Sequence, residues 1–238
     1  MKSKRGGEKV QEKPVQTEEK KEPSFAAGLN FYKLFWIFFI GCIIGVIVET
    51  LWCLAVLHHI ESRQGLVYGP FNPVYGVGAI LMTLGLNWLA KKSDFLIFMG
   101  SAIIGGLFEA ACSLFQEYVF HTISWNYTDK FGILGGRTSL LYMVFWGVLG
   151  LMWIKEIFPR LSNLIERMPN KIGRRVTIVL VIFMAFNIIV SSAAVLRMEA
   201  RKTNPVPANA LEQLLDERFP DERMKKVYPN LIPVDPNE

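Results

Sequence analysis

Five long apolar segments dominate the pattern of hydrophobic and polar positions along this chain, and charged or Gly/Pro-containing links separate them. A membrane-spanning helix needs roughly 20 predominantly apolar residues. The pattern therefore predicts five transmembrane helices, at about 30–57, 73–90, 95–119, 137–157 and 175–197. The expected fold is an all-α, polytopic membrane protein embedded in the lipid bilayer.

The two ends of the chain have a different character. Residues 1–24 are polar and charged, offer nothing to build a core from, and are expected to be a disordered arm. The transmembrane domain is expected to occupy residues 25–200, and its first apolar run is too long for the h-region of a cleaved signal peptide. Residues 201–238 form a polar tail with short amphipathic helix patterns, the first of which Asn209 can cap.

Composition supports an integral membrane protein. Hydrophobic residues make up 51% of the 238-residue chain and the mean hydropathy is +0.28, which is too apolar for an ordinary soluble domain. The net charge is +5, but the Lys and Arg residues cluster beside the apolar segments and are not interleaved with aromatic residues on a basic surface. No nucleic acid is therefore expected as a partner. The three cysteines lie inside apolar segments and are interpreted as small packing residues.

The distribution of Lys and Arg predicts the orientation. The N-terminal arm, the link at 91–94 and the link at 155–175 are rich in basic residues, whereas the links at 58–72 and 120–136 are poor in them. Because basic residues favour the cytoplasmic side, the N-terminus is predicted to be cytoplasmic. Five crossings then place the tail on the opposite side, although Arg197, Arg201 and Lys202 favour the reverse.

An internal repeat occurs in the first and third apolar segments. Gly41, Gly45 and Glu49 recur 60 positions later as Ser101, Gly105 and Glu109. Positions i, i+4 and i+8 follow one stripe of a helix, so each acid continues a stripe of small residues along which helices approach closely. We expect two parallel helical hairpins, about 30–90 and 94–157, plus a fifth helix at 175–197, with both acids facing inward.

Arg137 begins the fourth segment and could reach the two acids. The resulting hypothesis is an inward-facing constellation of Glu49, Glu109 and Arg137. If Arg137 pairs with one acid, the other is left to protonate or to hold a cation. The alternative is an ion pair that only locks two hairpins together.

Two links carry further candidate binding residues. In the first, Asn72 can cap the second helix, and Gly69, Pro70 and Tyr75 lie beside that cap, which could bind an anion or simply form a tight re-entry into the membrane. In the second, Trp125 and Tyr127 are either interfacial anchors or groups that stack on a substrate.

No catalytic motif is present. The chain contains no Gly-x-x-x-x-Gly-Lys-[Ser/Thr] phosphate loop, no His-Glu-x-x-His and no Gly-x-Ser-x-Gly. The histidines show no ligand spacing that would complete a metal site. We therefore predict no enzymatic activity, no cofactor and no metal.

Several short motifs nevertheless occur in a defined order: Glu49 followed by Trp52, Gly65-Leu66, the run Gly69-Pro70-Phe71-Asn72-Pro73-Val74-Tyr75-Gly76, Glu109, Trp125-Asn126-Tyr127, and Gly136-Arg137. Over about residues 35–155 this combination resembles the ABC-transporter type IV permease family, also called CmpB-like, and the Gly-Pro-x-x-Pro-x-Tyr-Gly element is its most specific part. The resemblance implies a multi-pass protein of the bacterial plasma membrane and, from the family's name, a transporter permease subunit.

The leading hypothesis is a permease subunit that binds a separate ATPase on its cytoplasmic side and forms a homo-oligomer. The alternative is a non-transporting membrane scaffold or regulator whose buried charges are structural. A third interpretation, an intramembrane enzyme, would require the two carboxyl groups to lie roughly 5–10 Å apart.

Overall fold

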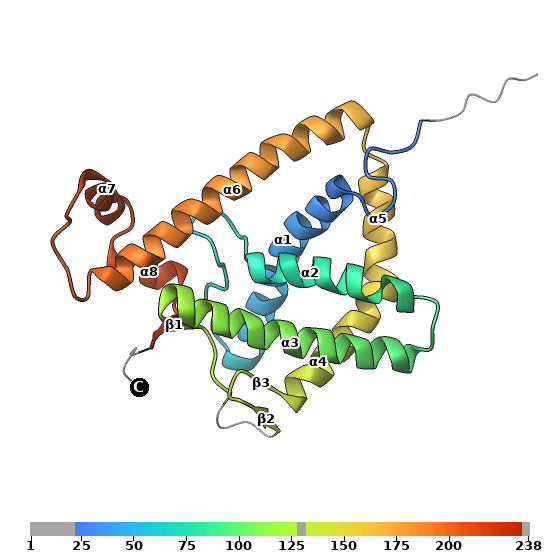
Figure 1. Ribbon diagram of the computed structural model, residues 1–238, viewed down its shortest axis with the longest axis horizontal. Coiled ribbons are helices and arrows are strands. Elements are labelled where there is room, and N and C mark those ends of the chain that lie inside the picture. The colour runs from blue at the N-terminus through green and yellow to red at the C-terminus, as the bar shows by residue number, and fades with distance from the viewer. Residues whose placement is uncertain (1–21, 128–131, 235–238) are drawn as a thin grey trace, which may run out of the picture.

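The computed structural model describes residues 22–127 and 132–234 (Figure 1). The fold is all-α and polytopic. Its helices are α1 (Phe31–Leu57), α2 (Pro73–Leu86) with a 3₁₀ turn (Asn87–Leu89), α3 (Asp94–Phe120), α4 (Leu140–Met152), a π-helical segment (Trp153–Ile157), α5 (Phe158–Glu166), α6 (Asn170–Ala200), α7 (Ala210–Arg218) and α8 (Asp221–Val227). Four two-residue strands are β1 (Thr122–Ile123), β2 (Ile133–Leu134), β3 (Thr138–Ser139) and β4 (Ile232–Pro233).

Four helical stretches of the described residues are long and apolar enough to cross a membrane: 31–56, 94–120, 140–166 and 170–200. The predicted fourth span is longer than expected, because α4 continues through the π-helical segment into α5. The predicted second span is shorter, because the apolar helix covers only 73–89. At 1.5 Å per residue that helix is about 25 Å long, which is less than a hydrocarbon core of about 30 Å.

The second helix is short because the chain before it re-enters the bundle. The backbone N–H of Asn72 donates to the carbonyl of Cys42, near the middle of α1. Asn187, near the middle of α6, holds Tyr68 on both sides: its Oδ1 accepts from the Tyr68 N–H at 3.3 Å and its Nδ2 donates to the Tyr68 carbonyl at 2.7 Å. Non-helical backbone is tolerated at this depth only where protein or water satisfies it. Residues 65–72 therefore form a re-entrant loop.

The two hairpins α1–α2 and α3–α4 are built from equivalent contacts. Gly45 of α1 lies directly against the ring of Tyr75, and Gly105 of α3 lies directly against the ring of Trp146. At the next residue of each second helix, Gly76 packs under Phe38 of α1, and Gly147 packs under Phe98 of α3. The first helices thus correspond at an offset of 60 residues and the second helices at an offset of 71. The glycines let each pair of helices approach closely, as small residues do in membranes.

The side of the molecule where α1, α3 and α6 begin is called the N-side. Lys33 of α1 is 1% exposed, and its ammonium group donates to Ser162 and, at 2.5 Å, to Glu166 at the end of α5. The Ser24 hydroxyl donates to the Glu166 carbonyl, and Phe25 is buried. Most of the predicted disordered arm, residues 1–21, lies outside the described residues.

The opposite side is called the loop side, and the C-terminal tail folds against it. β4 pairs antiparallel with β1, the Tyr228 hydroxyl donates to the Gly65 carbonyl at 3.2 Å, and Ser62 donates to the Val227 carbonyl at 3.0 Å. The tail therefore contacts both links that follow α1 and α3, opposite to residues 24–30. In Figure 1 these pieces gather at the left, and residues 22–30 lie at the upper right.

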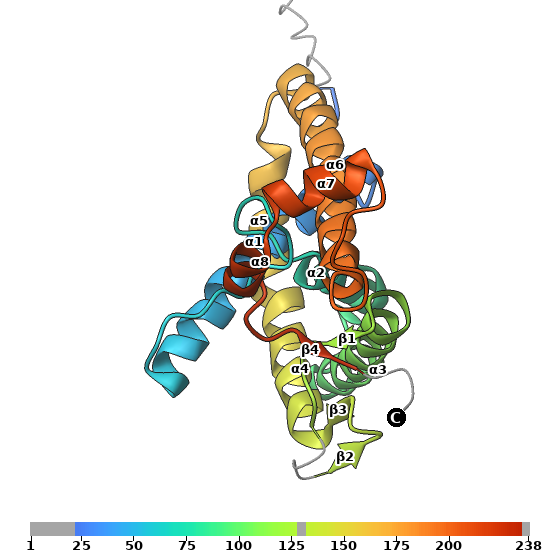
Figure 2. The same cartoon turned by 90° about the vertical axis from the view of Figure 1, so that its left-hand side faces the viewer.

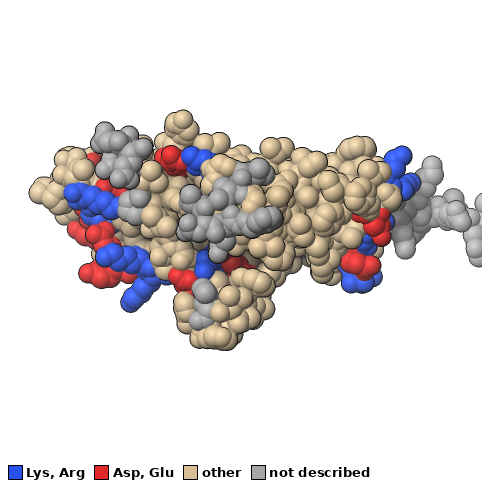
Figure 3. Space-filling view, turned by 90° about the horizontal axis from the view of Figure 1, so that it is seen from below, with Lys and Arg blue, Asp and Glu red and all other residues tan. Residues whose placement is uncertain are grey.

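The basic residues at the end of α6 and just after it are neutralised by nearby acids. Arg197 binds both oxygens of Asp216 at 2.9 and 2.7 Å, and Arg201 binds Asp216 and Asp221, each at 2.6 Å. Lys202 pairs with Glu199 at 2.6 Å. The positive charge of these residues favoured a cytoplasmic position for the tail, but nearby acids balance it. Figure 3 shows charged side chains over the left half and at the right end of the visible face, with a stretch of other residues between them.

Candidate functional site

Glu109 is the most buried acid of the bundle. It lies on α3 and is 9% exposed. The Tyr127 hydroxyl donates to its Oε1 at 2.8 Å and the Thr138 hydroxyl donates to its Oε2 at 2.7 Å, while Trp146 of α4 makes a further side-chain hydrogen bond. All these donors are uncharged. They tie α3 to the link before α4 and to α4 itself.

Glu49 occupies the equivalent position on α1 and has a different environment. The Tyr75 hydroxyl donates to its Oε2, and Arg63 lies 3.5 Å from its Oε1. Arg63 also pairs with Glu61 at 2.9 Å. A cluster of two carboxylates and one guanidinium therefore exists, but it consists of Glu49, Glu61 and Arg63 and belongs to the first hairpin alone.

Electrostatics connect the two acid clusters. Burial, followed by the negative charge of Glu109, raises the pKa of the Tyr127 hydroxyl well above its usual range. The hydroxyl groups of Tyr142 and Tyr75 act in the same direction. Glu49 and Glu109, together with their hydroxyl partners Tyr75, Tyr127 and Thr138, are called the polar region.

Arg137 lies on the loop side of that region and pairs with a different acid. Its guanidinium binds Glu117 at 2.6 Å and donates to the Ser113 hydroxyl at 3.2 Å. The expected pairing of Arg137 with Glu49 or Glu109 is thus replaced by a pairing with Glu117. Glu117 was missed because its place near the end of α3 resembles that of a solvated terminal residue.

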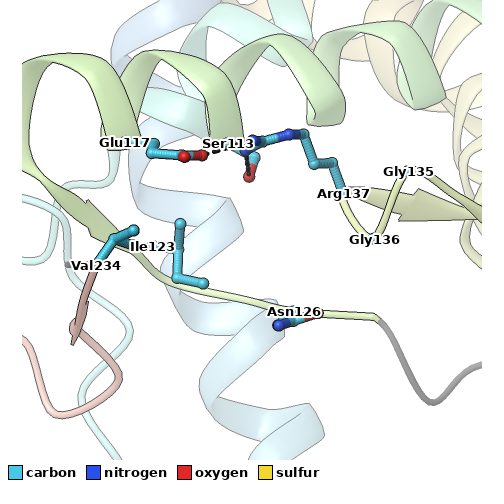
Figure 4. A pocket seen from close by; sticks show the side chains of 8 residues that line it. All are labelled: Ser113, Glu117, Ile123, Asn126, Gly135, Gly136, Arg137 and Val234. Carbon is cyan, nitrogen blue, oxygen red and sulfur yellow. Dashed lines mark hydrogen bonds and ion pairs between the residues drawn. The ribbon is translucent and has the colours of Figure 1, made fainter. Parts of the chain in front are cut away.

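A cavity of about 300 Å³ opens beside this ion pair. In Figure 4, Ser113 and Glu117 project from α3 toward the guanidinium of Arg137, and Val234 of the tail lies at the far side of the hollow. The cavity is lined by Ser113, Glu117, Ile123, Asn126, Gly135, Gly136, Arg137 and Val234.

A ladder of polar side chains joins the cavity to Glu109. Glu109, Ser113 and Glu117 are spaced by four residues on α3 and so follow one stripe of the helix. The same stripe begins with Ser101 and Gly105, which lie against Gly150 and Trp146 of α4. Small residues along the inner half of α3 therefore give way to hydrogen-bonding groups along its loop-side half.

The turn before α2 is a capped re-entry. The Asn72 side chain accepts from the Val74 N–H and donates to the Arg63 carbonyl, so the predicted cap is confirmed, with Pro73 as the first helical residue. Gly69 adopts φ = +74°, a left-handed conformation that favours glycine. Pro70 follows it in the loop. The cap uses the end of α2 that an anion would otherwise occupy.

Trp125 and Tyr127 both serve the second hairpin. The indole N–H of Trp125 donates to the Arg137 carbonyl at 3.2 Å, and the ring of Tyr127 stacks on Tyr142 with centroids 4.3 Å apart. Among the described residues, no group of three or more His, Cys, Asp or Glu side chains is placed to hold a metal ion.

Comparison with known protein families gives one match. The family described as "Putative ABC-transporter type IV" matches residues 36–192, which is more than half of the chain. The chain belongs to this family. The match extends past the second hairpin to α6, so the re-entrant loop and its anchor Asn187 lie within it. Neither the curated proteins nor the solved structures give a match.

Membership of the ABC-transporter type IV family supports a transporter-like role for this membrane protein, and the suspected family is confirmed. Together with the four long apolar helices, it supports a location in a membrane. Components of transporters commonly act with other subunits, so association with an ATPase is consistent with the family.

Proposed function

We propose that this chain is the permease component of a membrane transport system, and that its solute passes the polar region formed by Glu49 and Glu109. In this proposal each hairpin supplies one acid to the pathway, and the re-entrant loop lies beside the first hairpin, between α1 and α6. Transporter sites are commonly built where repeats meet and where a helix is interrupted at mid-membrane depth.

The observation that carries this proposal is the environment of Glu109. A carboxylate deep in a membrane protein is costly and commonly marks a route for ions or solutes. Here three uncharged groups hold it, and the ladder through Ser113 and Glu117 leads from it to the cavity on the loop side. A solute entering from the loop side would meet the Arg137–Glu117 pair first and Glu109 next.

The N-side suits a cytoplasmic ATPase partner. Its links carry exposed basic side chains at Lys91, Lys92, Arg160, Arg167, Lys171, Arg174 and Arg175. We assign this side to the cytoplasm because basic residues concentrate there. Four long helices and one short helix enclose little space, so the pathway is proposed to form in a homo-oligomer.

A conservative substitution of Glu109 tests the proposal. Glu109→Gln keeps the size of the side chain and one acceptor oxygen, replaces the other oxygen by an NH2 donor, and removes the negative charge. In cells with equal amounts of membrane-inserted protein, the variant should alter the levels of the same small solutes as deletion of the gene, as measured by mass spectrometry of cell extracts. Glu222→Gln, at an exposed position of α8, is the matched control and should leave these levels unchanged.

The second candidate is a scaffold or regulator without transport activity. It is favoured by the fact that the donors to Glu109 all come from its own hairpin, as expected of a group that fixes packing. Loss of folded protein in Glu109→Gln would support it. A folded Glu109→Gln protein with unchanged solute levels would also contradict the permease proposal.

A further inference from the structure

The tail helix α7 crosses the end of α6 instead of extending it. In Figure 1, α7 is seen almost end-on beside α6, and in Figure 2 it runs horizontally across the vertical ribbon of α6. A helix that crosses a membrane span at its end lies close to the plane of the membrane surface. This is the orientation of interfacial amphipathic helices.

One side of α7 is fastened to α6. Leu215 is buried in a cluster with Ala194 and Val195 of α6. Next to it on the helix, Glu212 and Asp216 pair with Arg197 at 3.0 and 2.7 Å. These contacts fix the rotation of α7 about its own axis.

The two flanks beside this contact differ in polarity. At 3.6 residues per turn, Leu211, Leu214 and, at the end of the helix, Arg218 lie on one flank, and Gln213 and Glu217 lie on the other. The leucines are 63% and 50% exposed. The Gln213 amide donates to the Glu217 carboxylate at 3.1 Å, so the other flank is a polar surface. A helix attached sideways to a span would present one such flank to lipid and the other to water.

The depth of the tail agrees with this arrangement. The cluster around Leu215 includes Val195 and Met198, within the last two turns of α6. Arg197, which pairs with Glu212 and Asp216 of α7, ends the apolar stretch of α6 and so places α7 at a level where charged groups are tolerated.

We propose that α7 is an interfacial anchor whose apolar flank, Leu211 and Leu214, enters the boundary between headgroups and acyl chains on the loop side. Val206, in the segment before α7, is a further exposed apolar side chain at 77%. The flank continues the lipid-facing surface of α6, where Ile189 and Leu196 are 68% and 44% exposed. Insertion of the two leucines holds the helix, and Arg218 at the end of the same flank can extend its guanidinium to the headgroups. The inference rests on the membrane-spanning fold and not on transport.

Spin labels on the two flanks test this inference. Leu211→Cys and Gln213→Cys carry a nitroxide label in the full-length protein reconstituted into phosphatidylcholine vesicles. The unsubstituted protein measures the background from its cysteines, of which Cys42 and Cys53 are buried and Cys112 is partly buried. Power saturation then compares accessibility to oxygen, which partitions into lipid, with accessibility to a water-soluble nickel chelate.

The expected result is an oxygen-to-nickel accessibility ratio several-fold higher at position 211 than at position 213. Equal ratios, with both labels open to the nickel chelate, would overturn the inference by placing α7 in water. A label at position 211 that neither reagent reaches would overturn it as well, because protein would then cover the flank.

Discussion

Replacing Gly105 with alanine tests the close approach of α3 and α4 beside Glu109. A Cβ atom at this position would lie 2.5 Å from the Cβ of Trp146, and closer still to the first atom of its ring. The Cβ of Trp146 is fixed to the backbone of α4 and cannot rotate away. The two helices must therefore separate, and the hydrogen bond between Trp146 and Glu109 is disturbed with them.

The magnitude follows from comparison with a second glycine. At Gly85 of α2 a Cβ atom would meet only Cδ1 of Ile104 at 2.7 Å, the movable end of a flexible side chain. Both substitutions gain the same preference of alanine for helix, about 1 kcal/mol. Their difference therefore isolates the clash, and overpacking of this kind costs about 1–3 kcal/mol. Gly105→Ala should be less stable than Gly85→Ala by that amount.

Reversible unfolding of the purified protein in mixed micelles, with helix content followed by circular dichroism, measures this difference. Gly45→Ala provides an independent repetition in the first hairpin, because Tyr75 occupies the equivalent place there. If Gly105→Ala and Gly45→Ala unfold at the same denaturant concentration as Gly85→Ala, the close packing of the two hairpins is refuted.

Two further predictions concern the re-entrant loop and the tail. Asn187→Leu leaves the N–H and carbonyl of Tyr68 without partners, each at a cost of about 1–3 kcal/mol, so hydrogen exchange should accelerate across residues 65–72 but not in an Ile189→Leu control. The hydrogen bond from Arg197, followed by that from Arg201, lowers the pKa of Asp216 to about 2 from its ordinary 3.8. Because the pKa of Asp216 is lower in the folded than in the unfolded protein, its ion pairs stabilise the folded tail. This stabilisation is fully present above roughly pH 5 and is lost as the pH falls toward 2. Hydrogen exchange of the α7 backbone, corrected for its intrinsic pH dependence, should therefore become faster as the pH falls through that range. In Asp216→Asn, the backbone of α7 should exchange at the faster rate at every pH.

The sequence was informative where short-range rules decide the structure. The long apolar runs predicted the spans, and the caps of α2 by Asn72 and of α7 by Asn209 follow from local hydrogen bonding. The depth of the re-entrant loop was not predicted, although the shortness of the apolar run after Pro73 was a usable signal. Asn187 and Ser191, each more than 110 residues away along the chain, explain how the polar groups of Tyr68 and the N–H of Val67 are satisfied.

The partners of the acids were harder to predict, because they come from distant parts of the chain. The donors to Glu109 lie at 127, 138 and 146, and Arg63 reaches Glu49 only because the link folds back. The repeat in the first helices of the hairpins has a spacing of 60 residues, which does not align Tyr75 with Trp146. These two residues are 71 positions apart because the link of the second hairpin is longer. Their equivalence becomes visible in the sequence when the spacing is allowed to change after the link.

The most direct test of the permease account is purification of the tagged full-length protein from its native host in a gentle detergent, followed by identification and counting of the proteins that accompany it. The account predicts a nucleotide-binding ATPase in a fixed ratio to this chain, lost when Lys91 and Lys92 together with Arg174 and Arg175 are replaced by glutamate. Recovery of the folded protein without any ATPase, alone or with envelope enzymes, would contradict the account and favour the scaffold.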